Sequence, residues 1–177
     1  PTVAEIPEWG TVQLRKHHFK DKDYIVRPLN PADERSLQDF FYSHSDDTLV
    51  LRYGYTPEQL SRQKSSALVS VDQSVDCAIA IIEEQGKHDI IHAVGRFYQT
   101  QNQGCEIAFV TREASQGQGM ASFLVENLIG IARDRGLSSI YAMFRSRNKP
   151  MLVVFYKFCF AVIDDIDIHE KELLLKL

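Results

Sequence analysis

Apolar positions along the chain change their spacing near its middle, and this change gives the central prediction. Glu106 to Val110 is a short run of mostly β-branched and aromatic residues, which is typical of a strand. Beyond it, apolar residues recur at helical spacing, at Met120, Phe123, Leu124, Leu128, Ile131 and Ala132, and Gly136 ends that pattern. The sequence therefore predicts a strand, a short loop and a long amphipathic helix.

The same reading assigns the remaining elements. Strands are predicted at 11–15, 24–28, 76–83, 90–98, 139–144, 162–168 and 173–177. Helices are predicted to begin at Asn30-Pro31, to run from Thr56 to about Leu68, and to span 149–158. Residues 1–10 are expected to be a loosely ordered lead-in, and 11–177 a single α+β domain.

Composition narrows the class of protein. The chain has 177 residues, of which 44% are hydrophobic and 25% charged, as in a soluble globular domain. Its net charge of −4 argues against a nucleic-acid partner held by a broad basic face. No secretory signal or membrane span is evident, so we expect no membrane partner and a cytoplasmic location.

Cysteine and histidine patterns indicate neither disulfides nor a metal. Cys77, Cys105 and Cys159 are widely spaced, which favours reduced thiols. Cys105 adjoins the central strand, and we weighed it as a nucleophile against a buried inert thiol. The second reading is favoured because no histidine and acid accompany it in sequence. The histidines show no ligand-type spacing, so no metal is expected.

The loop before the long helix, Ser115 to Ala121, is a candidate anion site. Two glycines there allow close approach to the backbone, and the first amides of a helix lack internal partners. Together these features suit a pyrophosphate. A glycine-rich helix entrance with no ligand is the alternative that spacing alone leaves open.

Gln116-x-x-Gly119-x-Ala121 resembles the (Gln/Arg)-x-x-Gly-x-(Gly/Ala) motif of the Gcn5-related N-acetyltransferases (GNAT). That resemblance implies a GNAT fold, a mixed and mostly antiparallel sheet with splayed fourth and fifth strands flanked by helices. It implies acetyl-CoA as acyl donor, with its pyrophosphate on the amides of Gln116, Gly117, Gln118, Gly119, Met120 and Ala121 and near the Ser122 hydroxyl. The pantetheine arm would lie along Phe109, Val110 and Thr111.

Further segments resemble the Pat-type protein lysine acetyltransferase domains in particular. They are Val26-Arg27-Pro28-Leu29-x-Pro31-x-Asp33-Glu34, Leu51-Arg52-Tyr53, and Asn148-x-Pro150-Met151-Leu152 with Phe160. The resemblance implies a protein lysine as amine acceptor, Glu106 as the catalytic base, and Asn148 as a contact of the pantetheine arm. The alternatives are that Glu106 is a strand glutamate facing solvent and that Asn148 is a helix cap.

The implied chemistry sets requirements on the site. A carboxylate with an ordinary pKa is a poor base for an ammonium group, so Glu106 should be partly buried. The acetyl carbonyl should meet a backbone amide of the splayed strand, for which we expect Val110. Arg112, Arg145, Arg147 and Lys149 are cations expected near the cofactor, and Arg52 and Tyr53 are expected to border the acceptor pocket.

One position departs from the family pattern. Many relatives carry a tyrosine seven residues after the asparagine, where it protonates the leaving thiolate; here that position is Phe155. Tyr156 is one residue further, about 100° around the helix, and is expected to point elsewhere. The usual glycine near the end of this helix is replaced by Cys159. Besides acetyl transfer, a non-catalytic acyl-CoA-binding regulatory domain and a small-amine acetyltransferase are therefore kept as alternatives.

Overall fold

The computed structural model describes residues 15–43, 68–145, 149–165 and 170–177. In these residues the chain forms an eight-stranded sheet of order β1-β2-β3-β4-β5-β6-β8-β7. Its strands are β1 (Arg15–Phe19), β2 (Lys22–Pro28), β3 (Cys77–Gln85), β4 (His88–Gln99), β5 (Gly104–Thr111), β6 (Ser139–Arg145), β7 (Ala161–Asp165) and β8 (Glu170–Lys176). The helices are α1 (Glu34–Tyr42), α4 (Met120–Asp134) and α5 (Lys149–Lys157), with 3₁₀ turns η1 (Pro31–Asp33) and η3 (Glu113–Ser115).

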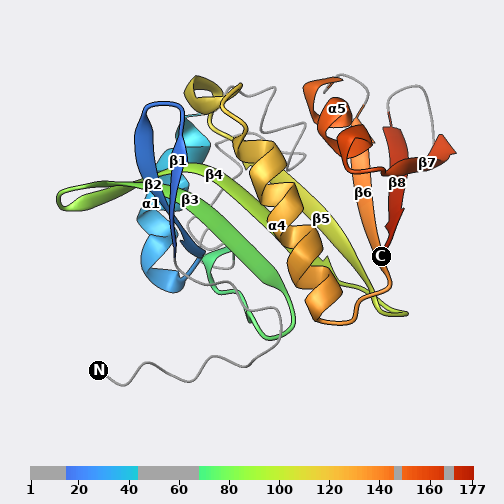
Figure 1. Cartoon of the computed structure of the whole chain (residues 1–177). Coiled ribbons are helices and arrows are strands. Elements are labelled where there is room, and N and C mark those ends of the chain that lie inside the picture. The colour runs from blue at the N-terminus through green and yellow to red at the C-terminus, as the bar shows by residue number, and fades with distance from the viewer. Residues whose placement is uncertain (1–14, 44–67, 146–148, 166–169) are drawn as a thin grey trace.

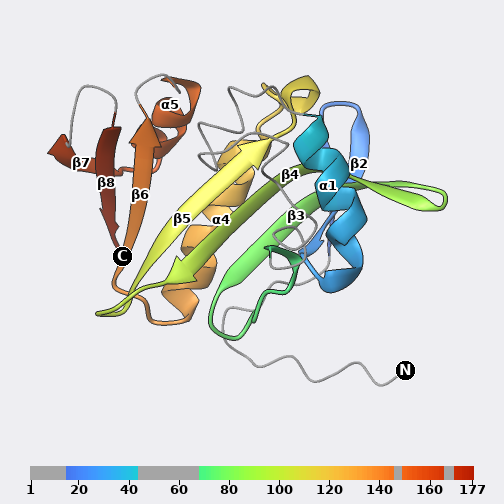
Figure 2. The ribbon, with the colours of Figure 1, turned by 180° about the vertical axis from the view of Figure 1, so that it is seen from behind.

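Helices cover both faces of the sheet. Figure 1 shows α4 and α5 on one face, and Figure 2 shows α1 on the other. Neighbouring strands pair antiparallel except β5 and β6, which are parallel. The predicted fold, a mixed and mostly antiparallel sheet flanked by helices, is confirmed.

The larger core cluster lies under α4. Leu124, Val125 and Leu128 of this helix are fully buried against β3, β4 and β5. Gly95 on β4 allows the close approach, because a Cβ there would lie 3.1 Å from Leu128 Cδ1 and 3.2 Å from Leu124 Cβ. The helix that carries the predicted anion site is thus held tightly against the strand next to β5.

The first two predicted strands, 11–15 and 24–28, are found as an antiparallel hairpin with different bounds. Its turn is Lys20-Asp21, and Phe19, which lies between the two predicted ranges, pairs with Lys22 as the last residue of β1. Phe19 packs on Phe123 of α4, with ring centroids 5.2 Å apart, because its apolar ring is buried there. Residues 11–14 of the predicted first strand lie outside the described residues.

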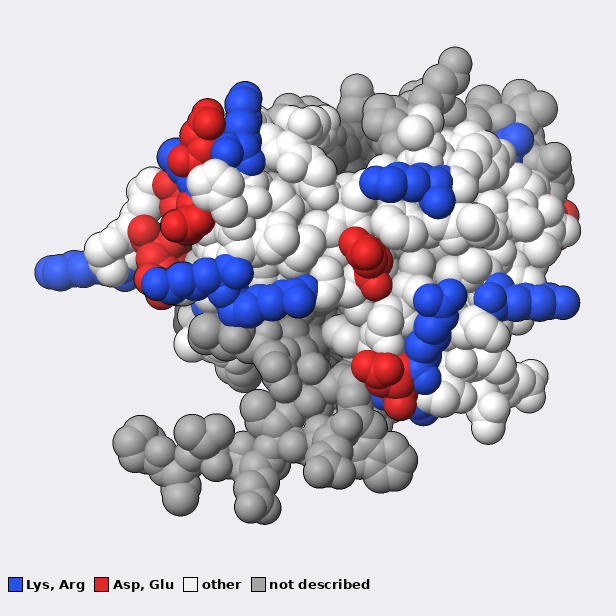
Figure 3. Space-filling view, viewed as in Figure 1, with Lys and Arg blue, Asp and Glu red and all other residues white. Residues whose placement is uncertain are grey.

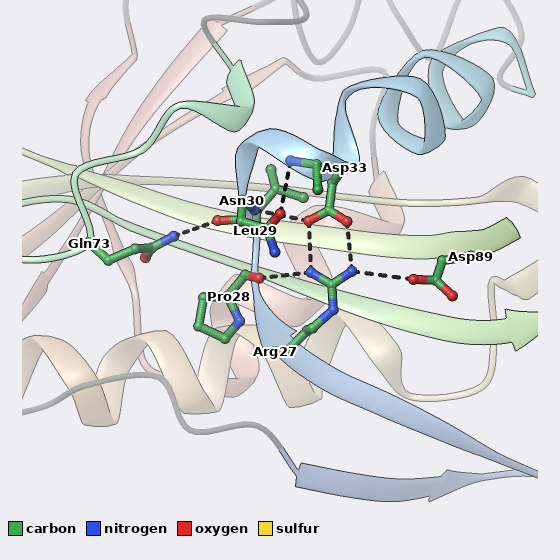
Figure 4. Close-up of polar contacts among 8 residues, drawn as sticks. Arg27, Pro28, Leu29, Asn30, Asp33, Gln73 and Asp89 are labelled. Atoms are coloured by element: carbon green, nitrogen blue, oxygen red, sulfur yellow. Dashed lines mark hydrogen bonds and ion pairs between the residues drawn. The ribbon is translucent and has the colours of Figure 1, made fainter. Parts of the chain in front are cut away.

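The start of α1 explains the Arg-Pro-Leu-x-Pro-x-Asp segment. Asp33, only 4% exposed, accepts two bonds from the Arg27 guanidinium, at 2.6 and 2.7 Å (Figure 4). Its carboxylate also accepts from the Asn30 amide, while the Asn30 side chain accepts from the Ala32 amide, so both halves of a capping box are present. The predicted helix start at Asn30-Pro31 is confirmed.

The remaining predicted elements are found within a few residues of their expected bounds, where they are described. The long helix ends as predicted, with Gly136 at φ 75° and its amide donating to Arg133 O at 2.9 Å. Residues 56–67 of the predicted second helix and 166–168 of the predicted strand 162–168 lie outside the described residues.

The end of α5 offers a stability test. Cys159 is exposed and has φ 67°, a left-handed conformation that costs a residue with a Cβ about 1–2 kcal/mol. Replacement by glycine removes that strain but adds freedom to the unfolded chain, so Cys159→Gly should raise the free energy of unfolding by about 1 kcal/mol. Equilibrium denaturation in urea checks this. An unchanged or lower midpoint would contradict it.

Candidate active site

The two central strands separate beyond a short stretch of pairing. Residues 104–106 of β5 pair with 139–141 of β6, and no pairing between the two strands continues beyond Glu106 and Tyr141. Figures 1 and 2 show the strands diverging from that end, which leaves one edge of β5 without a neighbouring strand. The predicted splay of the fourth and fifth strands is confirmed.

The ladder between β4 and β5 decides which amides face this open edge. The Thr100 amide donates to Gly104 O at 2.9 Å and the Arg112 amide to His92 O at 2.7 Å. Hydrogen-bonded pairs recur at every second residue of an antiparallel ladder, and the register between these two pairs is continuous. The main-chain N–H and C=O of Val110 therefore point toward β4, to its register partner Val94.

Phe109, one residue earlier on β5, has the opposite orientation. Its N–H and C=O point toward the side from which β6 has diverged, because alternate residues of a strand face alternate neighbours. The expectation that the Val110 amide serves the open edge is thus corrected to Phe109. Thr111 has the same phase as Phe109, so these two residues, and not Val110, present main chain to the fork.

The loop before α4 has the backbone of an anion site. Gly117 and Gly119 have φ of 77° and 85°, and a Cβ built on either would meet no atom within 4 Å. Gly119 is the N-cap, and among the described residues no side chain accepts from the first amides of the helix. Those amides, at the positive end of a 15-residue helix, are available to a ligand.

The other loop residues predicted to bind cofactor surround these amides. Gln116 is exposed and Gln118 half-buried, while Met120 turns its side chain into the core. Ala121 and Ser122 are half-buried in the first turn of α4. The Gln116 side-chain amide approaches Thr111 O at 3.5 Å, so it crosses from the loop toward the end of β5.

A polar chain that the sequence analysis did not identify supports this loop from behind. His92 on β4 lies with Nδ1 2.6 Å from Ser115 Oγ and Nε2 2.8 Å from Glu83 Oε2. Because an ionised carboxylate only accepts, Nε2 carries the proton and Nδ1 accepts from the Ser115 hydroxyl. Lys22 completes the chain by donating to Glu83 at 3.1 Å. Ser115 is 3% exposed and directly precedes Gln116. The hydrogen bonds among these side chains therefore fix the position at which the loop begins.

Burial and hydrogen bonding set the protonation states of His92 and Glu83. Desolvation is the main cause that lowers the pKa of His92, with the Arg112 and Lys22 charges adding to it against the favourable Glu83 contact. Burial also acts to raise the pKa of Glu83, but hydrogen bonds from His92, Lys22 and Gln85 outweigh it and leave that pKa below its usual value. His92 is therefore neutral and Glu83 ionised near neutral pH.

This protonation state predicts a pH dependence of stability. The folded pKa of His92 is below its unfolded value of about 6.5, so the unfolded chain binds more protons at mildly acidic pH. The stability from neutral His92 is present above pH 6.5 and is lost as the pH falls through that value. Between pH 7.5 and 5.5, melting temperature should therefore fall more in the wild type than in His92→Gln. An equal fall of melting temperature with pH in the two proteins would contradict this assignment, because they share all other titrating groups.

Glu106 lies at the root of the fork. It is the last residue of β5 that pairs with β6, and its Cα partners are Tyr98 on β4 and Tyr141 on β6. Its side chain is exposed, so the partial burial expected from the sequence is not found. On the opposite face of β5, Cys105 and Ile107 enter the core under α4.

The helix that follows β6 places a phenylalanine at the fork. Phe155 is 1% exposed and packs on Phe109 and Phe160, with ring centroids 5.3 and 5.0 Å away. Tyr156 is 49% exposed, so the prediction that it points elsewhere is confirmed. The ring of α5 that packs on β5 here is therefore a phenyl ring, which carries no hydroxyl.

The other predicted contributors are a cation bonded to β4 and residues that are not described. Arg112 donates to Ile91 O through Nε at 3.0 Å and Nη2 at 2.8 Å, which ties it to β4. Desolvation lowers its pKa. Arg52, Tyr53, Arg147 and Asn148 lie outside the described residues, and the side chains of Arg145 and Lys149 are not described.

The cysteines confirm the inert reading. Burial raises the pKa of the Cys77 and Cys105 thiols to about 12, so neither is a nucleophile at neutral pH. In the described part of the chain, no three His, Cys, Asp or Glu side chains are grouped so as to hold a metal ion.

Surface charge is mixed. Among the described residues on the face in Figure 3, Lys and Arg side chains are interspersed with Asp and Glu, and no broad basic area forms there. None of the described helices is both long enough and apolar enough to span a bilayer.

Comparison with known proteins identifies the family of the chain. The family model described as the acetyltransferase (GNAT) domain matches residues 24–160. The chain belongs to this family of acetyltransferases. A curated relative, Acetyltransferase PA5475 of Pseudomonas aeruginosa, is 25% identical over 129 residues, which are 72% of this chain and 69% of the relative.

Solved structures share the fold. The GNAT domain of S. lividans PAT superposes with a TM-score of 0.81 at 22% identity, covering 93% of this chain and 97% of that one. The yncA protein of Salmonella typhimurium, whose structure holds its cofactor acetyl-CoA, has a TM-score of 0.68 at 16% identity, covering 86% and 92%. The PaiA N-acetyltransferase of Thermoplasma acidophilum, in complex with coenzyme A, has a TM-score of 0.71 at 14% identity, covering 86% and 98%.

Proposed function

We propose that this chain is an N-acetyltransferase that moves the acetyl group of acetyl-CoA to a primary amine while both substrates are bound. The observation that carries the proposal is the uncapped N-terminus of α4 beside the open edge of β5. One extended ligand could contact both features, with a diphosphate at the helix N-terminus and an amide-rich arm along the strand edge.

The residues at the fork and the loop fit coenzyme A. The amides that follow Gly117 and Gly119 suit the pyrophosphate, since a helix N-terminus favours negative charge and the glycines leave the approach clear. The outward N–H and C=O of Phe109 suit the amides of the pantetheine arm, as a strand edge accepts a further extended chain. Acetyl-CoA supplies the activated acyl group as a thioester.

Two groups of the chain carry the chemistry in this proposal. The Phe109 amide donates to the acyl oxygen, where negative charge develops during attack by the amine. The Glu106 carboxylate receives the proton of the ammonium group, through water, because its side chain is open to solvent. With a phenylalanine at position 155, the leaving thiolate takes its proton from solvent.

The proposed acceptor is the side-chain amine of a protein lysine. Support comes from the Arg27 to Asp33 segment and the Asn148 to Leu152 segment, which resemble the Pat-type lysine acetyltransferase domains. The Arg27–Asp33 ion pair shows that the first of these segments shapes the connection from β2 to α1.

One observation favours a second candidate, a non-catalytic acyl-CoA-binding regulatory domain. Phe155, which is buried, has no hydroxyl at the position where many relatives carry a proton donor. Both candidates bind coenzyme A, and only the first releases free thiol when an amine is present.

The test has two parts. Calorimetric titration with coenzyme A should give saturable binding, and a free-thiol assay with acetyl-CoA should show release that depends on an amine. The amine panel holds lysine-containing proteins and peptides, small amines and aminoglycosides. Binding without thiol release from any amine would favour the regulatory domain, and absence of binding would overturn both candidates.

A further inference from the structure

A row of three side chains crosses the sheet at the root of the fork. Glu106 has Tyr98 as its register partner on β4 and Tyr141 as its register partner on β6. Register partners project on the same face, with Cβ atoms about 4.5–5.5 Å apart in an antiparallel pair. This face is the one opposite α4, because Cys105 and Ile107 alternate with Glu106 and enter the core under that helix. The strand on each side of Glu106 therefore carries a tyrosine on the same face of the sheet.

The three side chains of the row are at least partly accessible to solvent. Tyr98 is 39% exposed, Glu106 is exposed and Tyr141 is half-buried. The next residue of β5 on this face is Ala108, which is half-buried and small. On β5, the neighbour of Glu106 toward the diverging part of the fork is thus a methyl group rather than a large side chain.

Tyr98 is held in place by a buried cation. Arg96, on the same strand and face, is 1% exposed, and its Nη1 donates to the Tyr98 hydroxyl at 3.1 Å and to Leu68 O at 3.2 Å. Arg96 is the register partner of Ala108, the next residue of β5 on this face after Glu106. The hydrogen bond to Arg96 restricts the position of the Tyr98 hydroxyl.

This cation is costly. Within the described residues, Arg96 Nε and Nη2 have no hydrogen-bond partner, and no carboxylate pairs with the guanidinium. An arginine buried without an ion pair lowers stability relative to an apolar side chain of similar size. Besides the main-chain oxygen of Leu68, the hydrogen-bond partner of this group among the described residues is the hydroxyl of an exposed tyrosine, so the arginine is suited to positioning that tyrosine.

Tyr141 is fixed from the other side. A Cβ built on Gly104 would lie 3.1 Å from Tyr141 Cε2, so the ring lies against the bare backbone of Gly104, two residues from Glu106 on the same face. Glycine at this position makes room for the ring. Both aromatic neighbours of Glu106 thus have a structural reason for standing where they do.

We infer that Tyr98, Glu106 and Tyr141 form the acceptor site, and that they select an unbranched primary alkylammonium group such as the end of a lysine side chain. This inference rests on the proposed function and names its substrate class. Aromatic faces attract a cation and pack against methylenes, and a carboxylate between them accepts a charge-assisted hydrogen bond. Arg96 is a positioning residue for Tyr98. An uncharged alkyl chain can still pack against the rings but lacks the cation–π attraction and the charge-assisted hydrogen bond.

The test measures binding apart from chemistry. Coenzyme A-bound protein, which has no acetyl group to transfer, is titrated with Nα-acetyl-lysinamide and with Nα-acetyl-norleucinamide, which has the same four side-chain carbons but no ammonium group. The lysine compound should bind at least about tenfold more tightly. Tyr98→Ala should abolish this preference, and Tyr98→Phe, which keeps the ring but loses the bond to Arg96, should reduce it by less. Tyr156→Ala, an exposed tyrosine of α5, should leave it unchanged.

Equal affinity for the two compounds, or a preference that survives both Tyr98→Ala and Tyr141→Ala, would overturn the inference. The two tyrosine variants also guard against a failure of one of them to fold. Where the protein releases thiol, Tyr98→Ala should raise the KM for the lysine acceptor with the KM for acetyl-CoA unchanged. Failure of the proposed function is distinguishable, because it is seen as loss of coenzyme A binding or thiol release in the wild type; the titrations are then repeated on ligand-free protein.

Discussion

Glu106→Gln should lower kcat by about 10²–10⁴-fold, the usual contribution of a positioned general base. The substitution keeps the size and hydrogen-bonding reach of the side chain, and removes its capacity to hold a proton. Glu106 is exposed at the end of the paired part of β5, so the fold should not depend on its charge. Steady-state thiol release at saturating acetyl-CoA and amine measures the effect.

The matched control is Glu84→Gln, an exposed strand glutamate on β3, which should leave kcat unchanged. Affinity for coenzyme A, measured by calorimetry, should be the same in the wild type and both variants, because the diphosphate site lies on the α4 loop. Full activity of Glu106→Gln would remove this residue from the mechanism. A parallel loss of coenzyme A affinity would assign it to cofactor binding instead.

The order of elements could be predicted because local patterns determine it. The change from strand to helix spacing between Val110 and Met120 marks β5 and α4, and Asn30-Pro31 and Gly136 mark a helix start and a helix end through chemistry that is local to each. The GNAT-like loop was found in the same way. Its glycines are needed for positive φ, which a sequence can signal within a few residues.

Features that depend on pairing could not be predicted from any single segment. Whether Phe109 or Val110 faces the fork is decided by the phase of hydrogen bonds with β4, which the sequence of β5 does not contain. The same holds for the expected burial of Glu106. That side chain is on the face opposite α4, so it does not share the burial of its neighbours Cys105 and Ile107.

The supporting chain behind the loop is also a product of the fold. His92 meets Ser115 from 23 residues away and Glu83 from 9 residues away, and each of the three is ordinary in its own sequence context. The histidine occupies a place where the register of β3 and β4 shifts, between Ile81 and Ile82. Such an irregularity changes the direction of a side chain, and it has no signal in the local sequence.

Gly119→Ala should weaken coenzyme A binding at least about tenfold. Gly119 is the N-cap of α4 with φ 85°, and a methyl group there would project into space where no protein atom lies within 4 Å. In the proposed function that space belongs to the diphosphate. The substituted loop either keeps its backbone and crowds the ligand, or relaxes to negative φ and turns its amides away. Calorimetric titration with coenzyme A measures the loss.

Gly136→Ala is the control that separates ligand binding from strain. Gly136 has φ 75°, is also free of atoms within 4 Å, and lies at the opposite end of the same helix. Both substitutions should lower the free energy of unfolding by about 1–2 kcal/mol, since each puts a Cβ in the left-handed region. Gly136→Ala should nevertheless bind coenzyme A like the wild type. If the two variants lose affinity equally, the effect is a general softening of α4, and the diphosphate site does not lie at its N-terminus.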